Sequence, residues 1–376
     1  MESKIEAIVV GCSASGAIAA RDLAAGGVKT VVLEEHASQG KQGKCSGLVS
    51  KRGLKLLGVD SQALERCTVN EVRGALLHAK NGATLRVERR SSVACVLDRQ
   101  LFDEALAAQA AGEGAKILLK HRVTAVKEGG DGVRVWCGAK RFESKFVLGA
   151  DGAASPTAAS PSLGFPKIPR FVLGYETEFD GARVDDPDFV QLFFDSRAFP
   201  GFFAWLIPSG KKSVRAGFAT GGMSSFAYSK NAFHRLPAIE ALARSPWAKR
   251  VREYTHVIPV APRPKTQSGG GRGRVLLAGD AAGQVKATTG GGIVFGGLCA
   301  REAALCVKNA LDSNELPDYE RSWRKKYGAT LALHSALRKA LNAFGNRRFD
   351  FALRAARFAG AQRLFSEFGD MDFVLK

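Results

Sequence analysis

The sequence predicts an α/β fold in which a parallel-sheet domain is interrupted by an inserted mixed or antiparallel sheet and followed by a helical C-terminal region. Two glycine-rich stretches and one change of pattern support this prediction. The apolar segment 8–10 enters a turn between Gly11 and Gly16 that opens a helix, and the apolar segment 275–278 runs into a second glycine-rich stretch. Between them, after Pro156, short apolar segments separated by turn residues are typical of strands.

The N-terminal segment has the pattern of a strand, a tight turn and a helix. We expect the helix over 17–24 and a second apolar strand over 28–33. Such a turn directs backbone N–H groups and the positive helix end toward a pyrophosphate. Glu34, 23 positions after Gly11, has the spacing at which a carboxylate binds an adenosine ribose. Ser13 stands where the motif has its middle glycine, so this motif alone leaves a purely structural turn open.

The second glycine-rich stretch joins a strand end to a long helix. Asp280, at the strand end, can bond a polyol such as the ribityl chain of a flavin. Gly290 to Gly292 let the following helix approach a flat ring, with the positive end of the helix near the pyrimidine edge. The alternative is that Asp280 is an ordinary acidic loop residue in a flexible turn. We see no simple packing reason for a strand end, a glycine-rich loop and a long helix in this order, so the alternative is disfavoured. The two stretches together predict a flavin dinucleotide site.

The other elements follow from hydrophobic periodicity and turn residues. Helices are expected at 50–57, at 98–111 and from about 311 onward. Strands are expected at 74–78, 84–89, 95–97, 116–119, 123–127, 133–137, 146–149, 171–179, 189–194, 203–207 and 213–220. The dinucleotide domain is then discontinuous, over 1–50, 92–155 and 265–310, with the inserted sheet domain over 51–91 and 156–264 and the helical region over 311–376.

Composition and charge limit the classes of function. The chain has 376 residues, 45% of them hydrophobic, and a formal net charge of +19, which favours nucleic acid, an acidic membrane surface or a phosphorylated substrate as partner. No apolar run reaches the ~18 residues of a membrane-spanning helix, and we expect no signal peptide. The seven cysteines include no CxxC pair, so we expect no metal site, no disulfide framework and a cytoplasmic location.

Several residues stand at the landmarks of a known superfamily. The stretch 11–16, Glu34, Arg99, Asp151-Gly152 and Gly279-Asp280 resemble the glutathione-reductase-like FAD enzymes of the hydroxylase type, which have a Rossmann-like FAD-binding domain. More narrowly, the chain resembles the geranylgeranyl reductase family, and especially its archaeal lipid-saturating members. Three stretches carry this resemblance: Lys44-Cys45-Ser46-Gly47-Leu48-Val49-Ser50, Phe203-Ala204-Trp205-Leu206-Ile207-Pro208 and 279–293.

The sequence departs from the patterns of these families at four positions. These are Ser13 for glycine, Ala287 for proline, Phe203 for tyrosine and Ile207 for phenylalanine. The first bears on how tightly FAD binds, and the last two bear on substrate details.

The resemblance implies FAD as cofactor, a prenylated lipid or phospholipid as substrate, and an external electron donor, either a ferredoxin-like protein or NAD(P)H. It assigns the cofactor to Gly11, Ser13, Ser15, Gly16, Glu34, Cys45, Ser46, Gly47, Arg99, Val123, Asp280, Gly292 and Ile293. It assigns the substrate to Phe203, Trp205 and Pro208. Cys45 has three interpretations: an inert buried residue, a part of the flavin loop that only shapes the site, or a catalytic hydrogen donor beside the flavin.

The aromatic stretch 203–208 also supports an inference that does not depend on the resemblance. In a strand, Phe203, Trp205 and Ile207 point to one face, while Ala204 and Leu206 point to the other. A wall of large apolar side chains suits an isoprenoid chain. Ordinary packing within a sheet explains the same pattern, and only the resemblance favours the wall.

Three classes of function compete. The first is a flavin-dependent prenyl reductase that saturates double bonds of geranylgeranyl lipids. The second is a flavin monooxygenase or halogenase of the same fold, because halogenases carry a Trp-x-Trp-x-Ile-Pro motif that 203–208 half matches. The third is a basic nucleic-acid-binding protein on a degenerate flavin fold, which the lack of a recognition helix, an RNP-like motif or a zinc site disfavours.

The C-terminal region combines basic and aromatic residues in a way typical of helices that lie on anionic lipid. A solvated charged face over a helical core is the alternative. The lipid substrate implied by the resemblance favours peripheral membrane association. The residues concerned are Arg321, Arg324, Lys325, Lys326, Arg338, Lys339, Arg347, Arg348, Arg354, Arg357 and Arg363, with Phe344, Phe349, Phe351, Phe358 and Phe365 between them.

Overall fold

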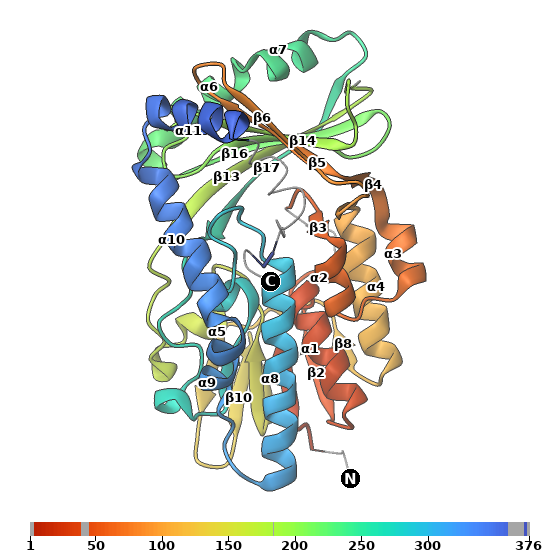
Figure 1. The fold of residues 1–376 in the computed structure, drawn as a ribbon. Helices are drawn as coiled ribbons and strands as arrows, with labels where there is room; N and C mark the ends of the chain where they lie inside the picture. Colours follow the sequence, from red (N-terminus) through yellow and green to blue (C-terminus); the bar gives the residue numbers. More distant parts are fainter. Residues whose placement is uncertain (1–3, 39–44, 183, 360–371, 374–376) are drawn as a thin grey trace.

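The computed structural model describes residues 4–38, 45–182, 184–359 and 372–373. Lys44, Arg363 and Phe365, which the sequence analysis named, lie outside these ranges. The chain forms two sheet-based layers, with a parallel sheet and its helices below and a large mixed sheet above (Figure 1). The predicted fold class is confirmed.

A parallel sheet of five strands forms the lower domain. Apolar residues dominate its short strands because helices or the next sheet cover both faces. In spatial order the strands are β18 (Val275–Leu277), β12 (Phe146–Gly149), β1 (Ala7–Val10), β2 (Thr30–Leu33) and β8 (Lys116–Leu118). An antiparallel sheet of β11 (Lys140–Ser144), β10 (Val133–Cys137) and β9 (Ala125–Glu128) packs against it.

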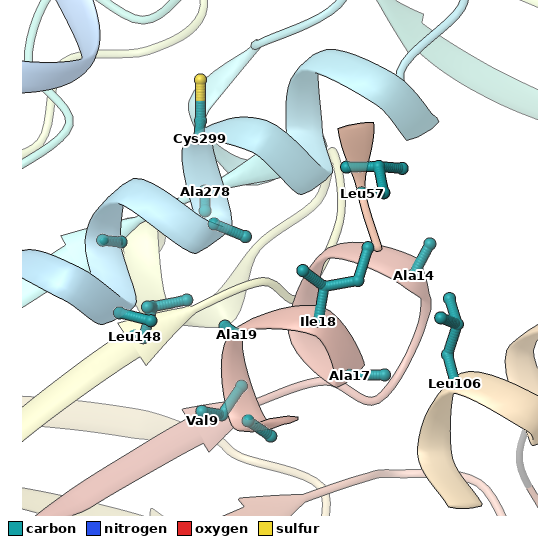
Figure 2. Close-up of a cluster of buried hydrophobic side chains, with 14 of the residues drawn as sticks. Val9, Ala14, Ala17, Ile18, Ala19, Leu57, Leu106, Leu148, Ala278 and Cys299 are labelled. Carbon is teal, nitrogen blue, oxygen red and sulfur yellow. The ribbon is translucent and has the colours of Figure 1, made fainter. Parts of the chain in front are cut away.

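Three helices pack on the other face of the parallel sheet. They are α1 (Ala14–Ala25), α4 (Arg99–Gly112) and α8 (Ile293–Ser313). Small residues on α1 allow close approach, and Figure 2 shows Ile18 of α1 among side chains that include Val9 of β1, Leu106 of α4 and Cys299 of α8. The helix expected at 17–24 is thus α1, which begins three residues earlier, at Ala14. Ser13, in extended conformation, is its N-cap.

A mixed sheet of seven strands forms the upper domain. In spatial order its strands are β17 (Lys249–Pro259), β13 (Phe171–Asp180), β16 (Ser213–Thr220), β15 (Ala204–Pro208), β14 (Phe189–Phe194), β5 (Gly74–Ala79) and β6 (Thr84–Glu88). Only β14 and β5 pair in parallel among these neighbours. The helices α6 (Met223–His234) and α7 (Pro237–Arg244) cover one face through the Phe218–Phe233 cluster.

The two domains meet at a small antiparallel sheet and a group of helices. The sheet contains β3 (Leu48–Ser50), β7 (Ala94–Leu97) and β4 (Thr68–Val72), so the strand expected at 95–97 joins this sheet and not one of the larger ones. The short helices nearby are α2 (Lys51–Leu56) and α3 (Ser61–Cys67), whereas α5 (Pro156–Ala159) packs on β9 and β18 in the lower domain.

The C-terminal helices connect the lower domain to the upper one. They are α9 (Tyr319–Trp323), α10 (Ala329–Ala343) and α11 (Asn346–Phe358). Figure 1 shows α10 rising beside the lower domain toward α11, which lies on the seven-stranded sheet. Leu353 and Phe349 of α11 pack against Leu85 and other side chains of β5 and β6. No helix in the described ranges is long and apolar enough to cross a membrane.

Candidate functional site

A cavity of about 1330 Å³ is lined by residues of both domains. Its polar part is formed by the β1–α1 turn, the end of β2, the start of α4 and the loop between β18 and α8. Its apolar part is formed by β5, β6, β14 and β15. The two parts are continuous.

The cavity brings together most of the residues that the sequence analysis singled out. The lining residues among them are Gly11, Ser13, Ser15, Glu34, Cys45, Ser46, Arg99, Val123, Asp280, Gly292, Ile293, Phe203 and Trp205. Gly16, Gly47 and Pro208 are not part of the wall. Pro208 ends β15, where its carbonyl accepts a hydrogen bond from Asn70 Nδ2 at 3.0 Å.

The two glycines outside the wall permit tight backbone contacts behind it. A Cβ on Gly16 would lie 2.0 Å from the carbonyl oxygen of Gly11, so no side chain fits there. Gly47 has a φ of +74°, and its Cβ would lie 2.4 Å from the carbonyl oxygen of Leu97. Both residues therefore shape the loops whose neighbours face the cavity.

The β1–α1 turn accommodates Ser13 without strain. Its φ is −79°, a value that does not require glycine, and its side chain faces the cavity and interacts with Asp103. Glu34 closes the other side of the turn, because its Oε2 accepts from the Cys12 N–H at 2.8 Å and its Oε1 pairs with His36 Nδ1 at 2.6 Å. A carboxylate has further acceptor capacity for a ribose hydroxyl.

Asp280 provides the test of whether a flavin dinucleotide fits. Its carboxylate is half-buried and lines the cavity, and no side-chain hydrogen bond to it is found among the residues that the structure describes. Loss of water around the carboxylate raises the pKa of Asp280 to about 6, although the Arg99 charge opposes this shift. A carboxylate turned into a cavity needs hydrogen-bond donors, and the hydroxyl groups of a ribityl chain would supply them. The residues present therefore fit FAD.

Arg99 links the flavin loop around Cys45 to the β1–α1 turn. Its Nη2 donates to both carboxylate oxygens of Asp103 at 3.0 Å, and its guanidinium interacts with the Cys45 sulfur. The Gly47 N–H lies 3.4 Å from the same sulfur and donates to it. Cys45 therefore faces a permanent positive charge inside the cavity.

The loop between β18 and α8 is held from outside by α10. Arg338 donates through Nε to the Ala287 carbonyl at 2.9 Å and through Nη2 to the Thr288 carbonyl. His334 Nδ1 lies 2.7 Å from Thr288 Oγ1. Arg338 was expected to contribute to a membrane surface, and this expectation is wrong, because the side chain is buried against Phe202 and the loop.

Asp372 holds the same loop from the C-terminal side. It forms an ion pair with Lys286 at 2.5 Å and accepts a hydrogen bond from the Ser50 hydroxyl. Its backbone carbonyl accepts from His334 Nε2 at 2.9 Å. Ser50 at the end of β3, His334 and Arg338 of α10, and Asp372 thus fix the position of the loop that borders the cavity.

A buried carboxylate on β13 joins the flavin loop to the aromatic strand. Glu176 is 1% exposed, accepts from the Trp205 Nε1–H at 3.1 Å, and accepts from the hydroxyl groups of Ser46 and Tyr254. Arg215 anchors the loop nearby, because its Nη1 donates to the Ser46 carbonyl at 2.9 Å and the Leu97 carbonyl at 2.8 Å.

The aromatic strand β15 alternates as the sequence predicts. Phe203, Trp205 and Ile207 belong to the apolar cluster on the cavity side, and all three line the cavity. Ala204 and Leu206 belong to the cluster under α6 and α7. The large side chains therefore face an open volume and not only a packed core.

Sequence reasoning missed four residues that organise this site, Glu176, Arg215, Lys286 and Asp372, and it gave a fifth, Arg338, a different role. Lys286 lies inside the glycine-rich stretch that the sequence analysis assigned to the cofactor, so this motif could have pointed to it. The other four lie in segments without a motif, and their roles arise from contacts between distant parts of the chain.

Comparisons with known proteins agree with this geometry. A family model described as FAD binding domain matches residues 4–296. Digeranylgeranylglycerophospholipid reductase 2 of Methanothermobacter thermautotrophicus is 30% identical, over 94% of this chain and 91% of the relative. An uncharacterized protein of Methanocaldococcus jannaschii is 28% identical, over 98% of this chain and 92% of the relative.

Solved structures share the fold. The crystal structure of a geranylgeranyl bacteriochlorophyll reductase-like protein from Thermoplasma acidophilum superimposes with a TM-score of 0.80 at 22% identity, over 93% of this chain and 90% of that one. The flavin-dependent brominase Bmp2 superimposes with a TM-score of 0.77 at 13% identity, over 99% of this chain and 94% of that one.

Proposed function

The chain belongs to the FAD-binding domain family and, within it, to the geranylgeranyl reductase family, and from this membership we propose that it saturates carbon–carbon double bonds in the geranylgeranyl chains of lipids. Members of this family are FAD-dependent oxidoreductases, and our proposal names the substrate on which this one acts. One observation carries it: the cavity that fits the cofactor continues into an apolar space under β15. Its volume of about 1330 Å³ exceeds the roughly 300–1,000 Å³ of a pocket for one ligand.

The polar part of the cavity has a place for each part of FAD. In this proposal the β1–α1 turn holds the pyrophosphate, Glu34 holds the adenosine ribose, and Asp280 holds the ribityl chain. FAD bound there would, once reduced, supply hydride to a carbon of the substrate. The protein orients both partners and excludes water from the apolar part.

The apolar part suits a prenyl chain with an anionic headgroup. Its wall contains Leu77, Leu85, Val87, Val190, Leu192, Phe203, Trp205, Ile207 and Ile258. The cationic side chains of Lys51, Arg52, Arg73 and Arg89 line the same cavity. Apolar contact with the chain and charge attraction to a phosphate would together select a prenylated phospholipid.

We assign Cys45 the role of proton donor to the second carbon of the double bond. Its thiol lines the cavity and interacts with the Arg99 guanidinium there. The alternative role, in which Cys45 only shapes the loop, predicts unchanged saturation when serine replaces it.

The exposed face of α11 is the membrane contact in this proposal. Phe351 and Phe358 lie on this face and are 74% and 96% exposed, and Phe344, which precedes the helix, is 39% exposed. Arg347, Arg348, Arg354 and Arg357 accompany them on the surface. The opposite face of α11 packs on Leu77, Leu85 and Val87, which also line the cavity, so a lipid drawn from this surface would have a short path inward.

Anaerobic reoxidation of the reduced protein tests the proposal. Photoreduced holoprotein should be reoxidised by digeranylgeranylglyceryl phosphate without oxygen, and not by its fully saturated analogue. A flavin monooxygenase or halogenase would instead be reoxidised only by oxygen, with hydroxylation or halide incorporation. Reduced ferredoxin and NAD(P)H, offered separately, would identify the electron donor.

A further inference from the structure

The inference concerns the source of the proton that each double-bond reduction consumes, and it rests on the proposed function. We propose that Tyr254, Glu176 and Ser46 form a proton relay from the edge of the seven-stranded sheet to the cavity. Glu176 acts through Ser46, so it is a positioning and relay residue and not a group that touches the substrate.

The hydrogen bonds around Glu176 form a continuous chain. The Ser46 and Trp205 donors share Oε2, and the Tyr254 hydroxyl binds Oε1. The indole N–H of Trp205 can only donate, so it fixes one carboxylate oxygen in place. The two hydroxyl groups can donate or accept, so a proton can enter through one carboxylate oxygen and leave through the other.

Burial of Glu176 among strands of the sheet favours its protonated form. Burial raises the pKa of Glu176, while the hydrogen bonds from Ser46, Tyr254 and Trp205 and the charge of Arg215 oppose the shift. Arg215 is itself paired with Glu178. At the outer end, the Arg252 guanidinium lies 5.1 Å from the centre of the Tyr254 ring and the His256 ring lies 5.8 Å from it.

One end of this chain of hydrogen bonds lies at the cavity, and the other lies at the edge of the sheet. Ser46 lines the cavity and directly follows Cys45, which lines it too. Tyr254 belongs to β17, the edge strand of the sheet, and is partly exposed. The relay therefore joins solvent at the sheet edge to the reacting region.

The proton balance of the reaction is complete with this relay. The substrate gains a hydride from reduced FAD on one carbon and the proton of the Cys45 thiol on the other, so one π bond is replaced by two C–H bonds. The Cys45 thiolate then regains its proton in one concerted shift, in which the Ser46 hydroxyl gives up its proton as it receives one from protonated Glu176, so no serine alkoxide forms. Glu176 regains its proton from solvent through the Tyr254 hydroxyl, which accepts one proton as it gives up another.

The variant Glu176→Gln keeps the shape of the side chain and removes its titration. With bound FAD unchanged, substrate-driven reoxidation should slow at least tenfold and lose the pH dependence that wild type shows, and Glu176→Asp should recover part of both. Glu253→Gln is the matched control, because Glu253 precedes Tyr254 on the same strand and pairs on the surface with Lys230 and Arg250. It should behave as wild type.

An infrared titration of the FAD-free protein separates this inference from the proposed function. In an Asp280→Asn background, which removes the contribution of that carboxyl group, the protein should show the carbonyl band of a protonated carboxyl group near neutral pH, and adding Glu176→Gln should remove it. No such band, or wild-type rates and pH profile in Glu176→Gln, would overturn the relay while leaving prenyl reduction intact. If wild type saturates no prenyl lipid, the proposed function fails, and the relay fails with it.

Discussion

Lys286 and Asp372 lie 86 positions apart in the chain and form an ion pair in which both side chains are buried. Lys286 belongs to the loop that borders the cofactor cavity, and Asp372 belongs to the C-terminal segment. Asp372 therefore helps to hold the loop that borders the cavity.

The first prediction concerns this pair. Asp372→Ala should lower the free energy of unfolding by about 3–5 kcal/mol, because it leaves the Lys286 charge buried without this partner. Bound FAD should also decrease, since the loop loses an anchor. Urea unfolding and flavin absorbance measure the two effects. The double variant Lys286→Met/Asp372→Leu should recover most of the stability.

A matched control is available on the surface of α8. Asp312 pairs with Lys308, and both side chains are exposed. Asp312→Asn should change the free energy of unfolding by less than about 1 kcal/mol. Equal losses in the buried and the exposed variants would contradict the role given to Asp372.

The second prediction concerns Asp280 and pH. Its pKa is raised from 3.8 to about 6, first by burial, so the folded FAD-free protein binds this proton more tightly than the unfolded chain. The contribution of Asp280 to stability therefore falls as pH rises from about 4 to about 6. Asp280→Asn should stabilise the FAD-free protein above pH ~6, by up to roughly 3 kcal/mol, and lose this advantage below pH ~4.

The same variant should bind FAD more weakly, because the amide replaces the carboxylate that accepts from the ribityl hydroxyl groups. Thermal unfolding with and without FAD across this pH range measures both effects. A pH-independent difference between variant and wild type would show that Asp280 does not titrate in this window.

The third prediction concerns Trp205. Trp205→Ala should lower kcat/KM for a geranylgeranyl lipid about 100-fold, because the substrate loses apolar contact worth roughly 3 kcal/mol. Bound FAD should stay near the wild-type level. Trp247→Ala is the control, because this tryptophan is 78% exposed and is not part of the cavity wall. If FAD is lost and turnover per bound flavin stays constant, Trp205 serves the core and not the substrate.

The fourth prediction concerns α11. Phe351→Ser should weaken binding to anionic vesicles about tenfold, since it removes an exposed ring. Burial of this ring in the lipid surface would contribute up to roughly 1.5–3 kcal/mol to binding. Binding of wild type should rise with the anionic lipid fraction and fall with salt. Met223→Ser, at an exposed position on α6, should bind as wild type does. Equal sedimentation with neutral and anionic vesicles would refute the membrane contact.

The sequence analysis predicted the elements that depend on local patterns. The turn at Gly11–Gly16, the loop from Gly279 and the alternation of β15 follow from backbone requirements or from a period of two, which a single sequence shows directly. It missed α6, α7 and β17. Strand β17 carries charged residues over much of its length because one edge is exposed, so it lacks the apolar alternation of a half-buried strand.

The contacts that complete the site could not be predicted in the same way. Glu176 meets Ser46 across 130 positions, and Arg338 meets Ala287 across 51. Arg338 lies in a region with many basic residues, where charge alone favours the surface. Only the fold shows that its partners are two loop carbonyls and that it is buried.

The most direct test of the account is the mass of the lipid product. Holoprotein supplied with digeranylgeranylglyceryl phosphate and a chemical reductant, without oxygen, should give products heavier by two hydrogens for each double bond reduced. Heat-inactivated protein should give none. An unchanged lipid mass after complete reduction of the flavin, or an added oxygen or halogen under air, would contradict the assignment of prenyl reduction.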